Sequence, residues 1–154
     1  MQRESIKLSF VSAKKTDVPF LLSLRQATMS EHLAKAGMEV DDNYHLNRIL
    51  EAFSDSLIIY FQEERIGLIK LSQQVEKLHI RQLQILPNFQ NKGIGSRVIK
   101  AVIKKANQLS LPITLNVLLN NPAKSLYLKN GFEIIGKNNF EYQMQYVMSA
   151  CISK

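Results

Sequence analysis

The sequence predicts a mixed α/β fold in which helices interrupt a mostly antiparallel sheet. Its length of 154 residues, 45% of them hydrophobic, suits one domain with a substantial core, spanning residues 1–154. Along the chain, the spacing of apolar residues changes between the period of a strand and that of a helix. In chain order, these periods give a strand, two helices, three strands, a helix, a strand, a helix and two strands.

The first part of the chain predicts one strand followed by two helices. Residues 6–13 alternate between apolar and polar side chains, as expected of a half-buried strand. The pair Thr16-Asp17 is typical of a helix N-cap, and apolar residues then recur at helical spacing until about Gly37. A second, shorter helix begins at Asp41 or Asp42.

The middle and the end of the chain predict the remaining elements. Two β-branched or aromatic runs separated by Glu63-Glu64-Arg65 indicate a hairpin, and a stripe of apolar residues later indicates a long amphipathic helix. No internal repeat or interdomain linker interrupts the order. The elements are a hairpin of Leu57–Phe61 and Ile66–Leu71, a strand over Lys77–Leu86, a helix over Gly93–Leu109, a strand over Ile113–Leu119, a helix over Pro122–Asn130, and strands over Phe132–Gly136 and Phe140–Met148.

The composition argues against several classes of protein. The single cysteine, Cys151, excludes an intramolecular disulfide framework and a cysteine-rich zinc site. The longest apolar run, Leu57–Phe61, is much shorter than the roughly 20 residues of a membrane-spanning helix. Residues 1–10 contain no hydrophobic signal segment, so we expect a cytoplasmic protein with no membrane partner. The three histidines are far apart and no HExxH motif is present, so we expect no metal.

Positive charge is concentrated in the middle of the chain. The formal net charge is +7, and residues 77–132 contain nine Lys or Arg residues and no Asp or Glu. Between Glu31 and Glu64 the balance reverses, with eight acidic residues against two basic ones. A basic segment suits nucleic acid, a membrane surface or a phosphate-rich small molecule. Because these basic residues are spread over strand, loop and helices without an aromatic platform, we expect no nucleic acid partner.

The segment Gln90-Asn91-Lys92-Gly93-Ile94-Gly95-Ser96 lies between a predicted strand and the long helix. Glycines at a helix N-terminus expose backbone N–H groups in a positive potential, which suits a phosphate or pyrophosphate. The Walker pattern fails because Ser96-Arg97 follows Gly95 in place of a Lys-Ser/Thr pair. The dinucleotide fingerprint fails because Val98 stands where a third small residue is needed. A tight turn without any ligand is the alternative for these glycines.

Two motifs about 30 residues apart extend this observation. The first is Gln90-x-x-Gly93-x-Gly95, and the second is Asn-Pro-Ala-x-x-Leu-Tyr-x-x-x-Gly-Phe over Asn121–Phe132. In this order and on these elements, they resemble the GNAT superfamily of acetyl-CoA-dependent N-acetyltransferases. The resemblance covers nearly the whole chain and implies a mostly antiparallel mixed sheet of six or seven strands flanked by about four helices. It also implies acetyl-CoA as cosubstrate and a small-molecule or peptide amine as acceptor, joined in a ternary complex.

The resemblance implies cofactor contacts residue by residue. The backbone of Leu83, Gln84 and Ile85 would pair with the pantetheine arm of acetyl-CoA. A backbone N–H near Ile85 or Leu86 would polarise the thioester carbonyl. The pyrophosphate would be held by the amides of Gln90, Asn91, Lys92, Gly93, Ile94, Gly95 and Ser96.

Tyr127 matches the family's usual general acid, which contacts the cofactor and protonates the departing CoA thiolate. A phenol with a pKa of about 10 is protonated at neutral pH and can donate to a thiolate. The alternative is a core aromatic side chain packed beneath Leu126 and Phe132. An Asn ahead of the same helix contacts the cofactor in similar proteins, and either Asn120 or Asn121 fits this position.

The general base is where this chain departs from the family. Many relatives use a Glu on the central strand or on the strand after the long helix, but residues 77–132 contain no acid. The base therefore comes from elsewhere, or a water relays the proton. Candidates outside this gap are Glu31, His32, His45, Glu76 and Glu141.

The two early helices form the acceptor wall in this family. The expected acceptor-site residues are Met29, His32, His45, Arg48 and Glu141. Each His has the alternative of a buried or surface polar side chain. The acidic early segment favours a cationic acceptor. Since the usual base is missing, a catalytically weak CoA-binding sensor or scaffold is the second functional hypothesis, and the sequence permits a homodimer without predicting one.

Overall fold

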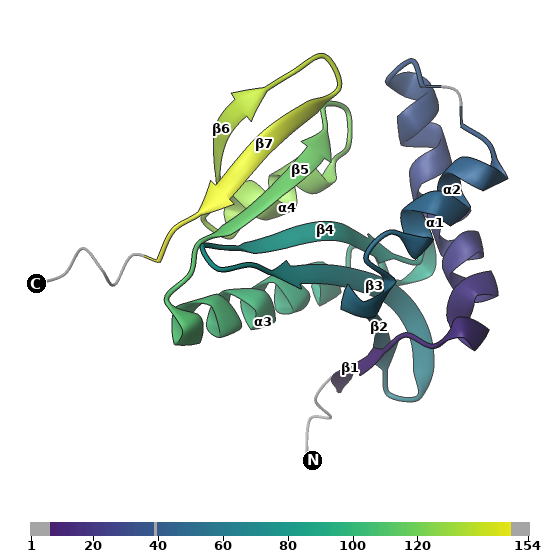
Figure 1. Cartoon of the computed structure of the whole chain (residues 1–154), viewed down its shortest axis with the longest axis horizontal. Coiled ribbons are helices and arrows are strands. Elements are labelled where there is room, and N and C mark those ends of the chain that lie inside the picture. The colour runs from purple at the N-terminus through teal and green to yellow at the C-terminus, as the bar shows by residue number, and fades with distance from the viewer. Residues whose placement is uncertain (1–6, 39, 149–154) are drawn as a thin grey trace, which may run out of the picture.

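A seven-stranded mixed sheet runs through the computed structural model, which describes residues 7–38 and 40–148 (Figure 1). The strand order is β1-β2-β3-β4-β5-β7-β6, and only the β4–β5 pair is parallel. The strands are β1 (Leu8–Ser12), β2 (Ser56–Phe61), β3 (Glu64–Gln73), β4 (Leu78–Ile85), β5 (Ile113–Leu118), β6 (Glu133–Lys137) and β7 (Glu141–Tyr146). The α-helices are α1 (Val18–Lys35), α2 (Asp42–Leu50), α3 (Ile94–Leu109) and α4 (Ala123–Lys129).

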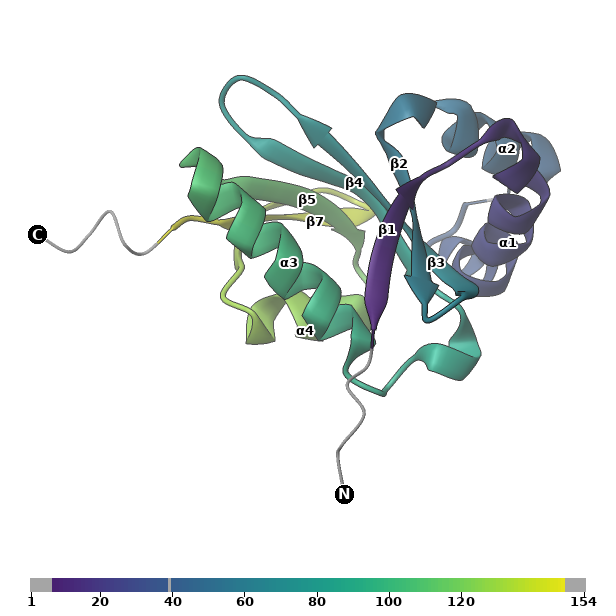
Figure 2. The same cartoon turned by 90° about the horizontal axis from the view of Figure 1, so that it is seen from below.

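Helices cover both faces of this sheet, so the core has two parts (Figure 2). Adjacent strand residues point to opposite faces. Ile58 packs in a cluster with α1 and α2, whereas Ile59 belongs to the cluster that includes α3. Full burial of such a side chain stabilises the fold by roughly 1.5–3 kcal/mol. Within the described ranges, no helix has the length and hydrophobicity needed to cross a membrane.

The sheet opens between β4 and β5. Their parallel pairing extends only from Leu78 opposite Ile113 to Ile80 opposite Leu115. β4 then continues to Ile85 without this neighbour, while β5 stays paired with β7 over its whole length. The two strands diverge visibly in Figure 1. This separation creates an opening at the carboxyl ends of β4 and β5.

The predicted element order is confirmed, and the boundaries differ by a few residues. One such difference is the hairpin turn, which the sequence places at Glu63-Glu64-Arg65. Phe61 pairs directly with Glu64, so the loop holds only two residues, and Gln62 takes a φ of 59°. Two-residue hairpin loops need positive φ to match the strand twist. The turn is therefore tighter than its charged residues indicate.

Candidate active site

The opening beside β4 exposes one edge of that strand. In antiparallel pairing, backbone groups turn alternately toward and away from the neighbouring strand. Leu86 N–H donates to the Ile66 carbonyl at 2.8 Å, and the register turns the Gln84 backbone toward β3 in the same way. Leu83 and Ile85 therefore direct their backbone groups toward the opening. From the sequence, the N–H of Ile85 or of Leu86 is expected to polarise the thioester carbonyl. The Leu86 N–H is already bonded within the sheet, so the Ile85 N–H is the one that faces the opening.

The loop before α3 presents backbone N–H groups. Gly93 is the N-cap residue with a φ of 81°, and no side chain of the described residues caps the helix. The first helical bond joins Arg97 N–H to the Gly93 carbonyl at 3.2 Å. The amides ahead of it have no acceptor inside the helix; they belong to Ile94, Gly95 and Ser96. Together with the helix dipole, these amides suit an anion such as a pyrophosphate.

Other contacts hold this loop beside β4. Gln90 Nε2 donates to the Ile85 carbonyl at 2.8 Å, which ties the loop to the end of the strand. Gly95 lies close to α4, because a Cβ there would be 3.1 Å from Leu126 Cδ2. Residues 91–92 are exposed, and Asn91 has a left-handed φ of 62°. The glycine-containing segment 90–96 thus has two roles: some of its residues hold the loop in place, and others present backbone amides at the start of α3.

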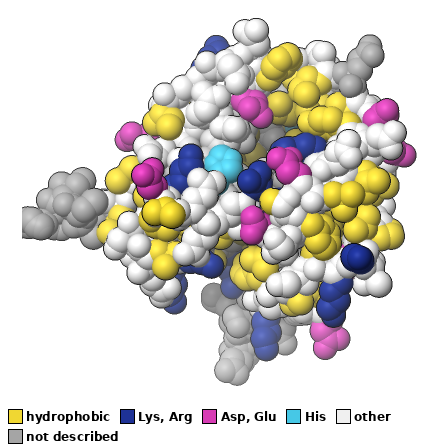
Figure 3. Space-filling model, in the orientation of Figure 1, with side chains coloured by type: hydrophobic (Ala, Val, Ile, Leu, Met, Phe, Trp, Pro, Cys, Tyr) yellow, Lys and Arg dark blue, Asp and Glu magenta, His cyan; other side chains and the backbone are white. Residues whose placement is uncertain are grey.

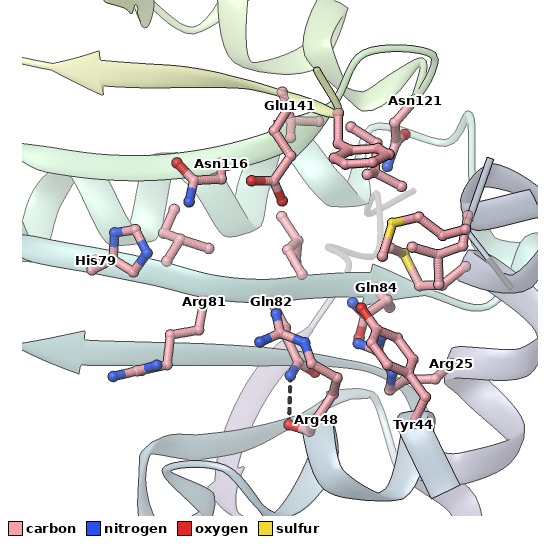
Figure 4. A pocket seen from close by; sticks show the side chains of 18 of the residues that line it. Arg25, Tyr44, Arg48, His79, Arg81, Gln82, Gln84, Asn116, Asn121 and Glu141 are labelled. Carbon is pink, nitrogen blue, oxygen red and sulfur yellow. Dashed lines mark hydrogen bonds between the residues drawn. The ribbon is translucent and has the colours of Figure 1, made fainter. Parts of the chain in front are cut away.

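A cavity of about 460 Å³ lies where β4 and β5 separate (Figure 4). Side chains of α1, α2, β4, β5 and β7 line it. Of the predicted acceptor-site residues, Met29, Arg48 and Glu141 are in this lining, whereas His32 and His45 are not. In Figure 3, Lys and Arg side chains gather near the middle of the face drawn, beside a His and among acidic side chains.

Glu141 is the carboxylate of this pocket. It begins β7 opposite Leu118, and its backbone N–H donates to Asn138 Oδ1 at 2.8 Å. Its carboxylate points into the pocket in Figure 4, and the described lining contains no other Asp or Glu. The other candidate carboxylates lie elsewhere: Glu31 pairs with Lys35 at 3.3 Å on the surface, and residue 76 is exposed.

The early acidic segment does not form the pocket wall. None of its described acidic residues, from Glu31 to Glu64, lines the cavity. Helices α1 and α2 instead contribute the basic side chains of Arg25 and Arg48. Since Glu51 forms ion pairs with Arg48 at 2.8 Å and Arg81 at 3.4 Å, acidic residues here serve the structure. The expectation of a cationic acceptor therefore loses its basis.

The two candidate asparagines have different surroundings. Asn121 lines the pocket, and its Oδ1 accepts from Ala123 N–H at 2.9 Å at the start of α4. Asn120 is exposed and is not part of the lining. Asn121 is therefore the better placed of the two for a ligand in this cavity.

Tyr127 is buried in α4. It is 5% exposed, its ring centroid lies 5.6 Å from that of Phe132, and it is not among the pocket-lining residues. Burial raises the pKa of its phenol above the ordinary value. The hydroxyl is thus held in the protonated form, and the ring also has the core contacts of the alternative interpretation.

Arg25 is a buried arginine at the pocket wall. It is 2% exposed, and its Nε donates to Nδ1 of His45 at 3.2 Å. Since Nδ1 accepts, the proton of the neutral ring lies on Nε2, which donates to Ser30 Oγ at 3.0 Å. Burial, and then the charge of Arg25, lower the pKa of His45 and favour this neutral form. His45 therefore positions Arg25 from behind the pocket.

Lys70 and Gln82 fix α2 against the sheet. Lys70 is fully buried, and its Nζ donates to the carbonyls of Arg48 at 2.8 Å, Ile49 at 2.8 Å and Glu51 at 2.6 Å. Gln82 Nε2 donates to the Arg48 carbonyl at 2.8 Å. A helix C-terminus leaves such carbonyls without partners. Burial, and then Arg48, lower the pKa of Lys70 to about 8.

The sequence patterns above do not single out Arg25 or Lys70, although each carries a signal. Arg25 follows Leu21 by one helical turn on the buried face of α1, and Lys70 interrupts the apolar run of β3. A charged residue at a core position needs partners, because burying an unpaired charge is costly. Within the described ranges, no group of three or more His, Cys, Asp or Glu side chains is placed to hold a metal ion.

Solved structures share this fold. The PaiA N-acetyltransferase of Thermoplasma acidophilum, solved with coenzyme A, is 19% identical; the match covers 93% of this chain and 100% of that chain, with a TM-score of 0.72. An acetyltransferase of Thermus thermophilus is 16% identical over 93% of this chain and 98% of that one, with a TM-score of 0.75. Arabidopsis thaliana Naa50, solved with the bisubstrate analogue CoA-Ac-MVNAL, is 19% identical over 92% and 99%, with a TM-score of 0.66.

Sequence comparison defines the family. No curated protein matches the chain at a significant level. The sequence profile of the acetyltransferase (GNAT) family matches residues 19–132, which include both motifs and most of the sheet. With the shared fold, the open edge of β4 and the free amides of α3, this match shows that the chain belongs to the acetyltransferase (GNAT) family.

Proposed function

We propose that the protein is an acetyl-CoA-dependent N-acetyltransferase that transfers an acetyl group directly to a primary amine in a ternary complex. One observation carries this proposal: the open edge of β4 ends beside the uncapped N-terminus of α3. A free strand edge suits the amides of a pantetheine arm, and free helix amides suit a pyrophosphate. The coenzyme A complex of the Thermoplasma acidophilum enzyme supports the same interpretation.

The residues of this region fit acetyl-CoA. The backbone of Leu83 would bond to the pantetheine arm, because it faces the opening. The Ile85 N–H faces the same opening, whereas the Ile85 carbonyl already accepts from Gln90 Nε2. The first amides of α3 would hold the pyrophosphate. Asn121, which follows β5 in the chain, lines the pocket and would contact the cofactor there. When bound, acetyl-CoA supplies the acetyl thioester as acyl donor.

The chain's own groups would then move the protons. Glu141 accepts the proton that the amine nitrogen loses as the new C–N bond forms. The Ile85 N–H polarises the carbonyl oxygen. Tyr127 donates a proton to sulfur as the C–S bond breaks, and burial keeps its phenol protonated by raising the pKa. The amine gives up one proton and the thiolate gains one, so the products are an amide and a free thiol.

Thiol release tests this function. The full chain is incubated with acetyl-CoA and a panel of primary amines and short peptides, and free thiol and product mass are measured. We expect at least one amine to raise thiol release above hydrolysis and to gain one acetyl group. Tight coenzyme A binding without transfer to any amine would contradict an acetyltransferase.

A CoA-binding sensor or scaffold is the second candidate. It is favoured by the burial of Tyr127 outside the pocket lining, since a general acid must reach the sulfur. Such a protein binds coenzyme A and acetyl-CoA by calorimetry but acetylates nothing. The thiol-release panel separates the two functions, because only the enzyme gives an acetylated product.

A further inference from the structure

The acceptor pocket has more positive than negative charge. Its described lining contains three guanidinium groups, from Arg25, Arg48 and Arg81, and one carboxylate, from Glu141. Glu51, outside the lining, pairs with both Arg48 and Arg81 and so offsets part of their charge. Arg25 remains without an acidic partner: within residues 7–38 and 40–148, no carboxylate lies within ion-pairing distance of it.

Arg25 is built into the pocket wall. Only 2% of it is exposed, and it is held from behind by His45, whose other nitrogen is bonded to Ser30. The Tyr44 ring lies 6.0 Å from its guanidinium carbon. A buried charge without a counter-ion is costly, and an arginine fixed in one orientation is prepared for bidentate binding of an oxyanion. This arrangement is typical of a binding site for an anion.

Neighbouring cations strengthen the positive potential here. Burial, and then the charge of Arg48, lower the pKa of Arg25 to about 10, which is the direction expected where positive charges face one another. Lys70 lies behind the same wall, and its pKa is lowered by burial and by Arg48, Arg25 and Arg81. Glu51 and Tyr44 are the groups that act in the opposite direction. An anionic ligand in the pocket would relieve this repulsion.

The anion expected at Arg25 is not a phosphate group of acetyl-CoA. The free amides proposed for the pyrophosphate belong to α3, and no α3 residue is part of the pocket lining. Arg25 and Arg48 come from α1 and α2, the wall opposite β5 and β7. In Figure 4, Arg48 and Glu141 face each other across the pocket. The positive wall therefore belongs to the acceptor's part of the cavity.

We propose that the acceptor is a small amine that also carries an anionic oxygen group, which pairs with Arg25 and Arg48 while the amine lies toward Glu141. A carboxylate or a phosphate satisfies this chemistry. Among the described residues, two buried amide oxygens have no hydrogen-bond partner, Oε1 of Gln82 and of Gln84. Both residues line the pocket, and N–H groups of the acceptor would bond to these oxygens. This inference rests on the proposed acetyltransferase function and names the substrate class of that site.

Matched pairs of acceptors test the inference. Straight-chain amino acids of increasing length are compared with amines of equal length that end in a neutral amide or a second amine. Aminoalkylphosphonates form a further series that distinguishes a phosphate-like group from a carboxylate. We expect kcat/KM to be about 10- to 100-fold higher for the anionic member of the best pair, as for a charged hydrogen bond. Equal values for anionic, neutral and cationic amines would overturn the inference and leave the acetyltransferase standing.

Variants assign the preference to Arg25. In Arg25→Met, the ratio of kcat/KM between anionic and neutral acceptors should fall to near one. In Arg25→Lys the ratio should fall in part, because the charge is kept but the two parallel N–H groups of the guanidinium are lost. The matched control is Arg65→Met, because Arg65 also lies over an aromatic ring, Phe20 at 4.7 Å, but outside the pocket. An unchanged ratio in a folded Arg25→Met variant would overturn the role of Arg25.

A binding measurement on the wild-type chain tests the anion site without any substitution and without acetyl transfer. In the wild-type chain saturated with coenzyme A, carboxylates that lack an amine should raise the melting temperature, and their neutral amides should not. If no amine is acetylated but carboxylates bind, the acetyltransferase function fails and the anion site stands. If neither carboxylates nor alkylphosphonates bind, or if only acidic peptides are acetylated, a small anionic acceptor is wrong.

Discussion

The proposed cofactor site and the proposed acceptor pocket beside it are built in different ways. The cofactor side, meaning the open edge of β4 and the first turn of α3, offers backbone groups from two neighbouring stretches of chain. The acceptor side, meaning the wall from α1, α2 and β7, offers side chains from three distant segments, among them Arg25, Arg48 and Glu141. A site made of backbone groups can bind the same cofactor in proteins of very different sequence. A site made of side chains can bind a different ligand after a single substitution.

Removing the carboxylate of the acceptor side should have the largest effect. We expect Glu141→Gln to lower kcat by about 1,000-fold, because a general base contributes within this range. Coenzyme A affinity should not change, since Glu141 lies on the other side, and the KM of the acceptor should not rise. Steady-state kinetics and calorimetry measure the two quantities. Glu133→Gln on the exposed face of β6 is the control; equal kcat in both variants would remove Glu141 from the mechanism.

Removing the phenol tests whether the buried Tyr127 acts at the sulfur. We expect Tyr127→Phe to lower turnover by about 100-fold with little change in coenzyme A affinity, because only the proton donor is lost. The half-buried Tyr60→Phe on β2 is the matched control. Unchanged turnover across several acceptors would leave Tyr127 as a core aromatic side chain.

The same contrast explains what the sequence could predict. The element order and the α3 loop follow from patterns along the chain: the period of the apolar residues, the glycines before the long helix, and two short motifs about 30 residues apart. The acceptor wall could not be derived in this way, because it forms only when α1, α2 and β7 meet beside the separated strands. The net acidity of the early segment was a misleading signal, because none of its described acidic residues lines the cavity and Glu51 pairs with the pocket arginines Arg48 and Arg81.

Local signals also missed a close approach within the sheet. Gly67 on β3 lies against β4, where a Cβ would overlap the carbonyl oxygen of Gln84. Only the paired strands make this glycine necessary. Similarly, the reason for Lys70 inside an apolar strand is the end of α2, which lies about 20 residues earlier in the chain. Buried polar residues thus depend on tertiary contacts that a periodic pattern does not contain.

Lys70, behind the acceptor side, should make the free energy of unfolding depend on pH in the alkaline range. Its pKa is lowered from 10.5 to about 8 by burial and then by Arg48, so between these values the unfolded chain binds more protons than the folded one. The free energy of unfolding should therefore rise with pH across this window, by about 2 kcal/mol relative to Lys70→Met. Urea unfolding at several pH values measures this difference. The exposed Lys100→Met on α3 should show no such trend.

The smallest effect expected is on the cofactor side, where one charge should act with opposite signs on binding and on stability. Ser96→Asp places a carboxylate in the first turn of α3, whose positive end has no side-chain cap. This should raise the free energy of unfolding by about 0.3–1 kcal/mol, since an acid at a helix N-terminus is favourable. It should weaken coenzyme A binding about 10-fold, because the new charge opposes the pyrophosphate.

The control for this variant is Asn107→Asp, which adds the same charge near the other end of α3 at an exposed position. It should lower stability slightly and leave coenzyme A affinity unchanged, because a negative charge is unfavourable at a helix C-terminus. Calorimetry and chemical unfolding give both values for each variant. Parallel changes in affinity and stability in Ser96→Asp would mean that the loop is only disturbed; opposite changes would mean that the free amides of α3 bind the phosphates.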